Sequence, residues 1–281
     1  MGKLTAPKAA IQLSHILNTF SDAHGSSRFP VDVEYLALNC GELFNWSDHI
    51  TSVEATNIKN FEGCLVPSDQ RDRWLLLYNN NLAHGQIRFT QAHELGHYIL
   101  HRTLRESFRC TSEDMLNWSD DEKDIEAQAD QFSSYLLMPL DDYRKQITGA
   151  VDLDCLSHCA DRYGVSLTAA ILKWLGYTSE KAVIVISNDG YMNWAWSSRP
   201  AMKAGAFFRT RNNVIPIPQQ SLAANNKVKH SREGEVLPAR SWFKHAHPHS
   251  VLREMKIGSE QYGSIITLLI LAKDTDAWAP K

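Results

Sequence analysis

The chain has 281 residues, of which 43% are hydrophobic and 22% are charged, and its formal net charge is -3. These values exclude the disordered and collagen-like classes and leave room for one large or two modest domains. The longest apolar run, residues 265–272, is under half of the roughly 20 residues that a membrane-spanning helix requires. No membrane span is therefore predicted.

The cellular compartment is indicated by the N-terminus and the cysteines. Residues 1–25 contain no continuous apolar segment of the kind found in secretory signals. The five cysteines are an odd number and are scattered along the chain, which favours reduced thiols over a disulfide framework. We therefore expect a cytoplasmic protein.

The N-terminal part predicts two helices followed by a small sheet. Apolar residues recur with helical spacing between Ile11 and Phe20. A second periodic segment follows Pro30, which we place at the first position of its helix. Short β-like runs, separated by Asn, Asp and Gly clusters, then predict three or four strands, at residues 52–56, 63–67 and 74–78.

The middle of the chain predicts two long helices and a helical hairpin. The apolar period becomes helical at Ile87, and another amphipathic segment, residues 125–137, ends before Pro139. Two short helices then meet at Gly164, and they cover residues 155–163 and 167–175.

The residue pattern of the C-terminal part is typical of β-structure. Three runs alternate or are apolar throughout, and residues 188–190 form a hairpin turn signal. The runs are residues 182–186, 191–196 and 265–271. We therefore predict an α+β protein with a first domain at 1–150 that combines helices and a small sheet, a helical hairpin at 151–179 and a β-rich module at 180–281.

The sequence HELGH at residues 93–97 is an HExxH motif. On a helix, His93 and His97 lie one turn apart on one face, and each can offer a nitrogen to one Zn²⁺ ion. Glu94 then lies beside the metal, where it can act as the catalytic base. A helix with two incidental histidines is the alternative.

A catalytic zinc site needs a third protein ligand and an open fourth position. His101 follows His93 by eight residues, about 12 Å along a helix, so we expect it to pack near the site and not to bind the ion. Residues 125–137 offer Glu126 and Asp130, one turn apart. We favour Glu126 as the ligand and Asp130 as the acceptor for a ligand histidine. Competing ligands are Glu122 and Asp124, and surface carboxylates without any metal role are the alternative.

Two segments resemble the ImmA/IrrE family of HExxH metallo-endopeptidases. Residues 88–101, RFTQAHELGHYILH, are similar to the family's RFTxAHELGHxxLH run. Residues 126–139 contain EAQADQF and LLMP, which are similar to its ExxAxxFAxxLLMP segment. The resemblance covers roughly residues 30–176, and it implies a zincin-like catalytic domain with Glu126 as the third zinc ligand.

The resemblance also implies a reaction and a partner. The reaction is peptide-bond hydrolysis, in which Glu94 moves the proton of the attacking water. Tyr98, His101 and a residue of the later module remain open as the oxyanion stabiliser, and residues 63–67 are the candidate sheet edge for an extended substrate. Family members cleave or inactivate Xre-type helix-turn-helix repressors in phage, mobile-element or stress-response settings. Some carry a GAF-like C-terminal domain, which is the expectation for residues 180–281.

Two other functions compete with proteolysis. Residues 160–165 have the spacing of a helix-turn-helix, but residues 167–175 offer few polar groups to DNA bases. Residues 199–256 hold eleven Lys/Arg and three Glu, so direct nucleic-acid binding or a non-catalytic zinc sensor with an anionic ligand is also possible.

Smaller features are weaker indications. Possible second metal groups, each weighed against buried thiols or a loop, are Cys155, His158 and Cys159, and His245, His247 and His249. The tryptophans at 194, 196 and 242 favour a core or an interface.

Overall fold

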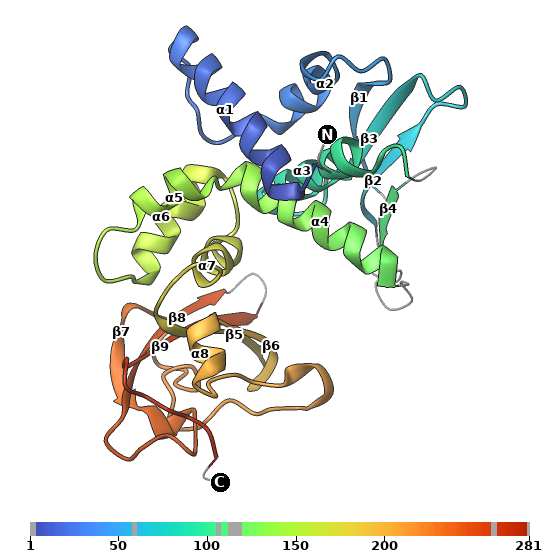
Figure 1. Ribbon diagram of the computed structural model, residues 1–281. Helices are drawn as coiled ribbons and strands as arrows, with labels where there is room; N and C mark the ends of the chain where they lie inside the picture. Colours follow the sequence, from blue (N-terminus) through green and yellow to red (C-terminus); the bar gives the residue numbers. More distant parts are fainter. Residues whose placement is uncertain (1–3, 58–60, 105–107, 112–119, 260–262, 280–281) are drawn as a thin grey trace. The chain divides into compact units, whose positions relative to one another are not determined.

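The computed structural model describes residues 4–57, 61–104, 108–111, 120–259 and 263–279 (Figure 1). The chain divides into two compact units, one formed by Met1–Lys145 with Ala160–Ser166 and the other by Gln146–Cys159 with Leu167–Lys281. Each unit contains one β-sheet. The predicted α+β class is confirmed.

The sheet of the first unit has four strands in the order β1-β3-β2-β4. These are β1 (His49–Thr56), β2 (Phe61–Pro67), β3 (Arg73–Asn79) and β4 (Phe108–Thr111). The strand β1 runs parallel to β3, and the other neighbouring pairs are antiparallel. Because β2 pairs with β3 on one side and with β4 on the other, our prediction that residues 63–67 form a sheet edge is wrong. The four residues of β4 are too few for their alternation to stand out in the sequence.

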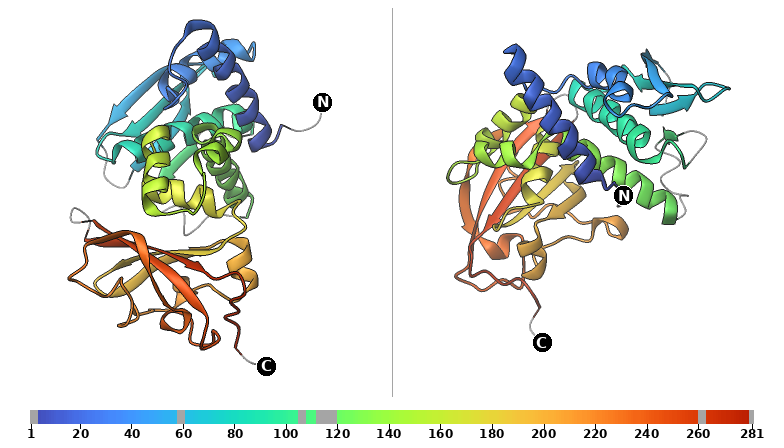
Figure 2. Two further views of the ribbon diagram at one scale, coloured as in Figure 1. Left: turned by 90° about the vertical axis from the view of Figure 1, so that its left-hand side faces the viewer. Right: turned by 45° about the horizontal axis from the view of Figure 1, so that its top comes forward.

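Two helices of this unit, α3 (His84–His101) and α4 (Asp120–Leu137), flank the predicted site. The unit also contains the helices α1 (Ala6–His24), α2 (Val33–Leu43) and α5 (Leu140–Gln146). The helix α3 lies against β2 and β3, and α4 packs beside α3 (Figures 1 and 2). The buried face of α1 begins with Ala6, Ala9 and Ala10, whose small side chains allow a close approach to α4.

The start of α2 differs from the prediction. The helix begins at Val33, and its N-cap is Asp32, whose side chain accepts a hydrogen bond from the Tyr35 N–H at 2.9 Å. Pro30 lies before the helix, in a cis peptide bond with Phe29. The carboxylate of Asp32, two residues beyond the proline, satisfies a free N–H at the helix start, so the helix begins at the next residue.

Two helices occupy the region predicted as a hairpin. They are α6 (Leu153–Tyr163) and α7 (Leu167–Leu175). Gly164 follows α6 with a φ of 62°, a left-handed conformation that favours glycine. Beside it, the Val165 N–H donates to the Ala160 carbonyl at 3.0 Å.

The second unit is built on an antiparallel sheet of five strands in the order β6-β5-β9-β8-β7. The strands are β5 (Lys181–Asn188), β6 (Tyr191–Ser197), β7 (His230–Pro238), β8 (Val251–Ser259) and β9 (Ser264–Leu271). The predicted turn between β5 and β6 is confirmed, since Asp189 and Gly190 have φ values of 49° and 81°. The likeness to a GAF domain stays a prediction.

The core of this unit is apolar, and one buried carboxylate, Glu254, lies next to it. Core side chains include Val183, Val185, Leu252, Leu269 and Phe243. The unit also contains α8 (Arg199–Lys203) and the short 3₁₀ segments η2 (Thr210–Asn212) and η3 (Ala239–Ser241). Beside the core, Glu254 accepts hydrogen bonds from Trp242 Nε1 and the Ala223 N–H, both at 2.6 Å.

Across the described ranges, no helix combines the length and the apolar character needed to cross a membrane.

Candidate metal centre

The helix α3 carries the HExxH residues into the interior of the first unit. At its start the Gln86 side chain accepts a hydrogen bond from the Ala83 N–H at 3.1 Å. His93 and His97 lie one turn apart further along the helix, on one face, and they are 8% and 0% exposed. Both imidazoles are thus withdrawn from water.

Three ligand atoms converge between α3 and α4. His93 Nε2 lies 2.9 Å from His97 Nε2 and 2.9 Å from Glu126 Oε2, and the third side of the triangle, His97 Nε2 to Glu126 Oε2, is 3.3 Å. Tetrahedral ligands bound to zinc at about 2.0–2.1 Å are about 3.3 Å apart. The donor set and its spacing therefore fit a single Zn²⁺ ion.

A close helix contact brings Glu126 to the histidines. A Cβ atom added at Gly96 would lie 3.0 Å from Phe132 Cδ1 and 3.3 Å from the Ala129 Cα. The missing side chain in α3 therefore lets the backbone of α4 approach. Glu126 lies one turn before Ala129 and faces the same gap.

Each histidine has a partner at its other ring nitrogen. His93 Nδ1 lies 2.9 Å from Asp130 Oδ1, and His97 Nδ1 lies 3.2 Å from His101 Nδ1. If both Nε2 atoms bind a metal, both Nδ1 atoms carry the proton, so Asp130 and His101 act as acceptors. The structure therefore brings together the three predicted ligands and the two residues predicted to support them.

The protonation states suit metal binding. Burial lowers the pKa of His97 from 6.5 to about 4, so its imidazole is neutral at pH 7. Burial alone would raise the pKa of Glu126, but hydrogen bonds with His93 and His97 hold it well below its usual range. Neutral imidazole and ionised carboxylate are the forms that bind zinc.

Glu94 lies on the side of α3 that faces β2. Glu94 is fully buried, with 0% of its surface exposed. A Cβ atom added at Gly63 of β2 would lie 3.0 Å from Glu94 Oε1 and 2.4 Å from Thr90 Cγ2. Only a glycine lets the strand pass this close to the carboxylate.

Comparison with known families agrees with this geometry. Residues 47–175 match the model of a peptidase family described as the IrrE N-terminal-like domain. This segment belongs to the ImmA/IrrE family. The predicted resemblance is confirmed over these residues, which include α3 and α4, and the chain contains a metallopeptidase-type domain.

Comparisons over the whole chain give the fold alone. No curated protein matched the chain. Among solved structures, a Mycobacterium tuberculosis transcriptional regulator has a TM-score of 0.50 and 12% sequence identity, and the alignment covers 92% of this chain and 75% of that chain. At this identity the likeness concerns the arrangement of the backbone.

Of the competing carboxylates predicted as ligands, the one whose side chain the structure describes does not join the cluster of proposed ligands. The Asp124 carboxylate is exposed and accepts a hydrogen bond from Gln128 Nε2 at 2.8 Å. The side chain of Glu122 lies outside the described part of the chain. Within the described residues, the group found with convergent ligand atoms is His93, His97 and Glu126, so the other Cys and His sets suggested by the sequence do not gather around one point.

Tyr98 supports the fold and is not available as an oxyanion stabiliser. Its hydroxyl donates to the Asp48 carbonyl at 2.8 Å, and its ring packs edge-on against Trp46 and Trp74. Burial raises the pKa of this phenol above its usual range. These contacts attach α3 to the sheet on the side away from His93.

Arg88, at the start of the family motif, is a structural residue that sequence reasoning missed. Its Nη2 donates to the Val31 carbonyl at 2.5 Å, and its side chain lies against Gly164. Burial lowers the pKa of its guanidinium. Arg88 thereby joins the segment before α2 to the turn after α6, and only its position in the RFT run could have drawn attention to it.

Proposed function

We propose that the chain is a zinc-dependent endopeptidase in which His93, His97 and Glu126 hold the ion and Glu94 is the catalytic base. One observation carries the proposal: two imidazole nitrogens and one carboxylate oxygen meet at one point, on helices that also carry Glu94 and Asp130. Three protein ligands leave a fourth position for the reacting groups. Membership of the 47–175 segment in a peptidase family supports the same function.

The protein's own residues have separate tasks in this reaction. Bound zinc would supply the Lewis acid that polarises the scissile carbonyl. Glu94 takes a proton from the attacking water and delivers it to the leaving amine nitrogen. Asp130 and His101 accept the Nδ1 protons of His93 and His97, which keeps both Nε2 atoms directed at the ion.

For the substrate we propose a helix-turn-helix repressor of the Xre type, in a phage, mobile-element or stress-response setting. The match of residues 47–175 to the peptidase family supports this choice. Such a substrate places the protein in the cytoplasm.

The test is cleavage of purified candidate repressors by the full chain, followed by mass spectrometry of the products and by metal analysis. Glu94→Gln removes the base but none of the three ligands, so it should keep zinc and lose cleavage. Glu34→Gln changes an exposed carboxylate on α2 and is the matched control, with wild-type cleavage expected. Equal cleavage by Glu94→Gln and wild type would remove Glu94 from its role.

A non-catalytic zinc sensor is the competing function. It requires metal binding but no turnover, so it predicts that zinc is bound while repressors stay intact with wild type and Glu94→Gln alike. The same assay therefore separates the two functions.

A further inference from the structure

The second unit contains a long segment of one charge sign. Residues 190–232 hold seven Lys/Arg and no Asp or Glu, although the whole chain has a formal net charge of -3. A basic stretch alone is most often a solvated face. The segment can indicate a binding site only if the fold brings its basic side chains together around a groove.

Part of this segment forms a groove along the sheet edge. Residues 194–196 of β6 and residues 208–212 line it, and its volume is about 580 Å³. Trp196 is 60% exposed, so of the two positions expected for it, core or interface, the core is ruled out. Arg209 and Arg211 are exposed on the opposite wall, and the described residues that line the groove include no carboxylate.

The groove is held in shape by contacts beneath and beside it. Phe208 stacks on Phe243 with ring centroids 5.2 Å apart and meets Trp242 edge-on at 5.9 Å. The Asn213 Nδ2 donates to the Arg209 carbonyl at 2.8 Å, which closes the short helix η2. Both walls of the groove are thus held by contacts within the protein, so a ligand would not have to fix their conformation when it binds.

The two arginines are available to a ligand. Among the described residues, no ion pair involves Arg209 or Arg211. Arg209 instead lies with its guanidinium carbon 5.6 Å from the centre of the Phe207 ring. Exposed guanidinium groups next to an exposed indole can bind phosphates while a base stacks on the ring.

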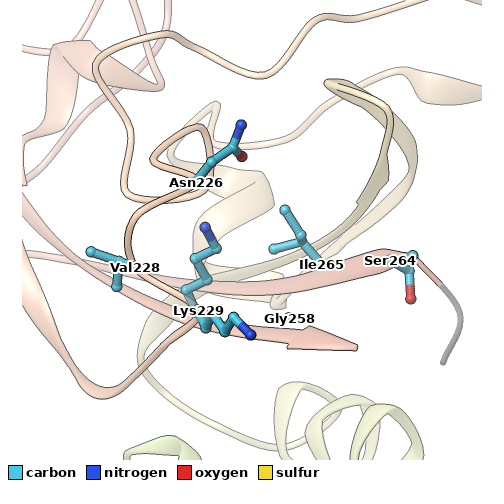
Figure 3. Close-up of a pocket in the computed structure, with 8 residues that line it drawn as sticks. Asn226, Val228, Lys229, Gly258, Ser264 and Ile265 are labelled. Atoms are coloured by element: carbon cyan, nitrogen blue, oxygen red, sulfur yellow. The ribbon is translucent and has the colours of Figure 1, made fainter. Parts of the chain in front are cut away.

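A second basic pocket in this unit does not combine an exposed aromatic ring with arginines that are available to a ligand (Figure 3). It has a volume of about 190 Å³, and Lys229 and Lys256 are among its lining residues. Lys256 Nζ already donates to the carbonyls of Leu222 and Asn225, at 3.2 and 2.9 Å. Its charge therefore serves to hold a loop, and the groove at β6 is the better site for an anion.

We propose that the groove between β6 and η2 binds single-stranded nucleic acid, with a base stacked on Trp196 and phosphates at Arg209 and Arg211. A single strand fits better than a duplex because stacking on an indole requires a base that is not already stacked and paired. This function is separate from the proposed proteolysis, since the groove and the metal-binding residues lie in different units.

The test uses the full chain and a short, mixed-sequence, fluorescently labelled single-stranded DNA, with binding measured by anisotropy over a series of salt concentrations. Trp196→Ala should weaken binding about tenfold, whereas Trp196→Phe keeps an aromatic face and should retain most of it. Replacing both Arg209 and Arg211 by Gln should lower the slope of log K against log salt by about 1.4, at about 0.7 per phosphate contact.

Two control variants keep the test specific. Lys244→Gln removes one exposed charge from the same unit outside the groove, and Tyr191→Ala removes an aromatic side chain that is 50% exposed on the same strand. Tyr191→Ala should bind like wild type, and Lys244→Gln should do so after correction for its one lost charge. The proposal is overturned if wild type does not bind the single strand at low salt, or if duplex DNA binds equally well. Equal losses in the control and groove variants would also overturn it.

Discussion

Replacing Gly63 by Ala tests how closely β2 and the proposed catalytic base are fitted together. The added Cβ would lie 2.4 Å from Thr90 Cγ2 and 3.0 Å from Glu94 Oε1. Carbon atoms in contact are normally about 3.5–4.0 Å apart, so either β2 or the Thr90 side chain must move by about 1 Å. Overpacking of this kind costs about 1–3 kcal/mol of the free energy of unfolding.

The same change should reduce cleavage beyond its effect on stability. A displacement of about 1 Å at a reacting group can cost about 100-fold in rate. Metal content should remain near that of wild type, because neither contact involves a proposed ligand. The measurements are urea unfolding, zinc analysis and the rate of repressor cleavage.

A second substitution separates the two effects. Thr90→Ser removes the Cγ2 atom and thus the 2.4 Å contact, but it leaves the 3.0 Å contact with Glu94. In Gly63→Ala with Thr90→Ser, stability should return toward that of Thr90→Ser alone, while cleavage should stay low. Full recovery of cleavage in the double variant would refute the idea that a Cβ at position 63 disturbs the catalytic carboxylate.

Three further predictions concern the surroundings of the site and the second unit. Asp130→Asn should weaken zinc binding about 10–100-fold in a chelator competition, because it alters the acceptor at His93 Nδ1, whereas the exposed Asp124→Asn should not. Gly96→Ala should cost about 1–3 kcal/mol in urea unfolding through its 3.0 Å contact with Phe132, and an unchanged midpoint would show that α4 gives way freely. Burial lowers the pKa of Lys173 from 10.5 to about 8, so the unfolded chain binds the extra proton between these pH values and the stability of wild type should rise by up to about 3 kcal/mol from pH 8 to 10.5. Lys173→Met should lack this rise, and equal pH profiles of the two proteins would contradict the assigned burial.

The convergence of the proposed metal ligands could be predicted because their relation is mostly local. His93 and His97 are one helical turn apart whatever the rest of the fold does. The choice of Glu126 could not be made from helical spacing, which allows other carboxylates as the third ligand. It also depends on the contact between α3 and α4, which Gly96 makes possible. The family pattern supplied that choice.

Features that depend on distant parts of the chain could not be predicted. Gly63 faces Glu94 only because β2 crosses α3 at that register, and a glycine within a strand signals no more than some close approach. The strand β7 lies at a sheet edge with little buried surface, so residues 230–238 lack the apolar alternation that marks a strand. The position of β4, which takes the sheet edge expected for β2, was hidden for a similar reason.

The burial of two carboxylates would give a bound metal a structural as well as a chemical role. Glu94 is 0% exposed, and the Glu126 side chain is 12% exposed. His97 is neutral at pH 7 because burial lowers its pKa to about 4, so its imidazole does not offset their charge. Withdrawing an ionised carboxylate from water costs several kcal/mol unless a positive charge compensates for it. A divalent cation held by His93, His97 and Glu126 would supply that charge, so the interior position of this helix pair and its proposed chemistry have the same cause.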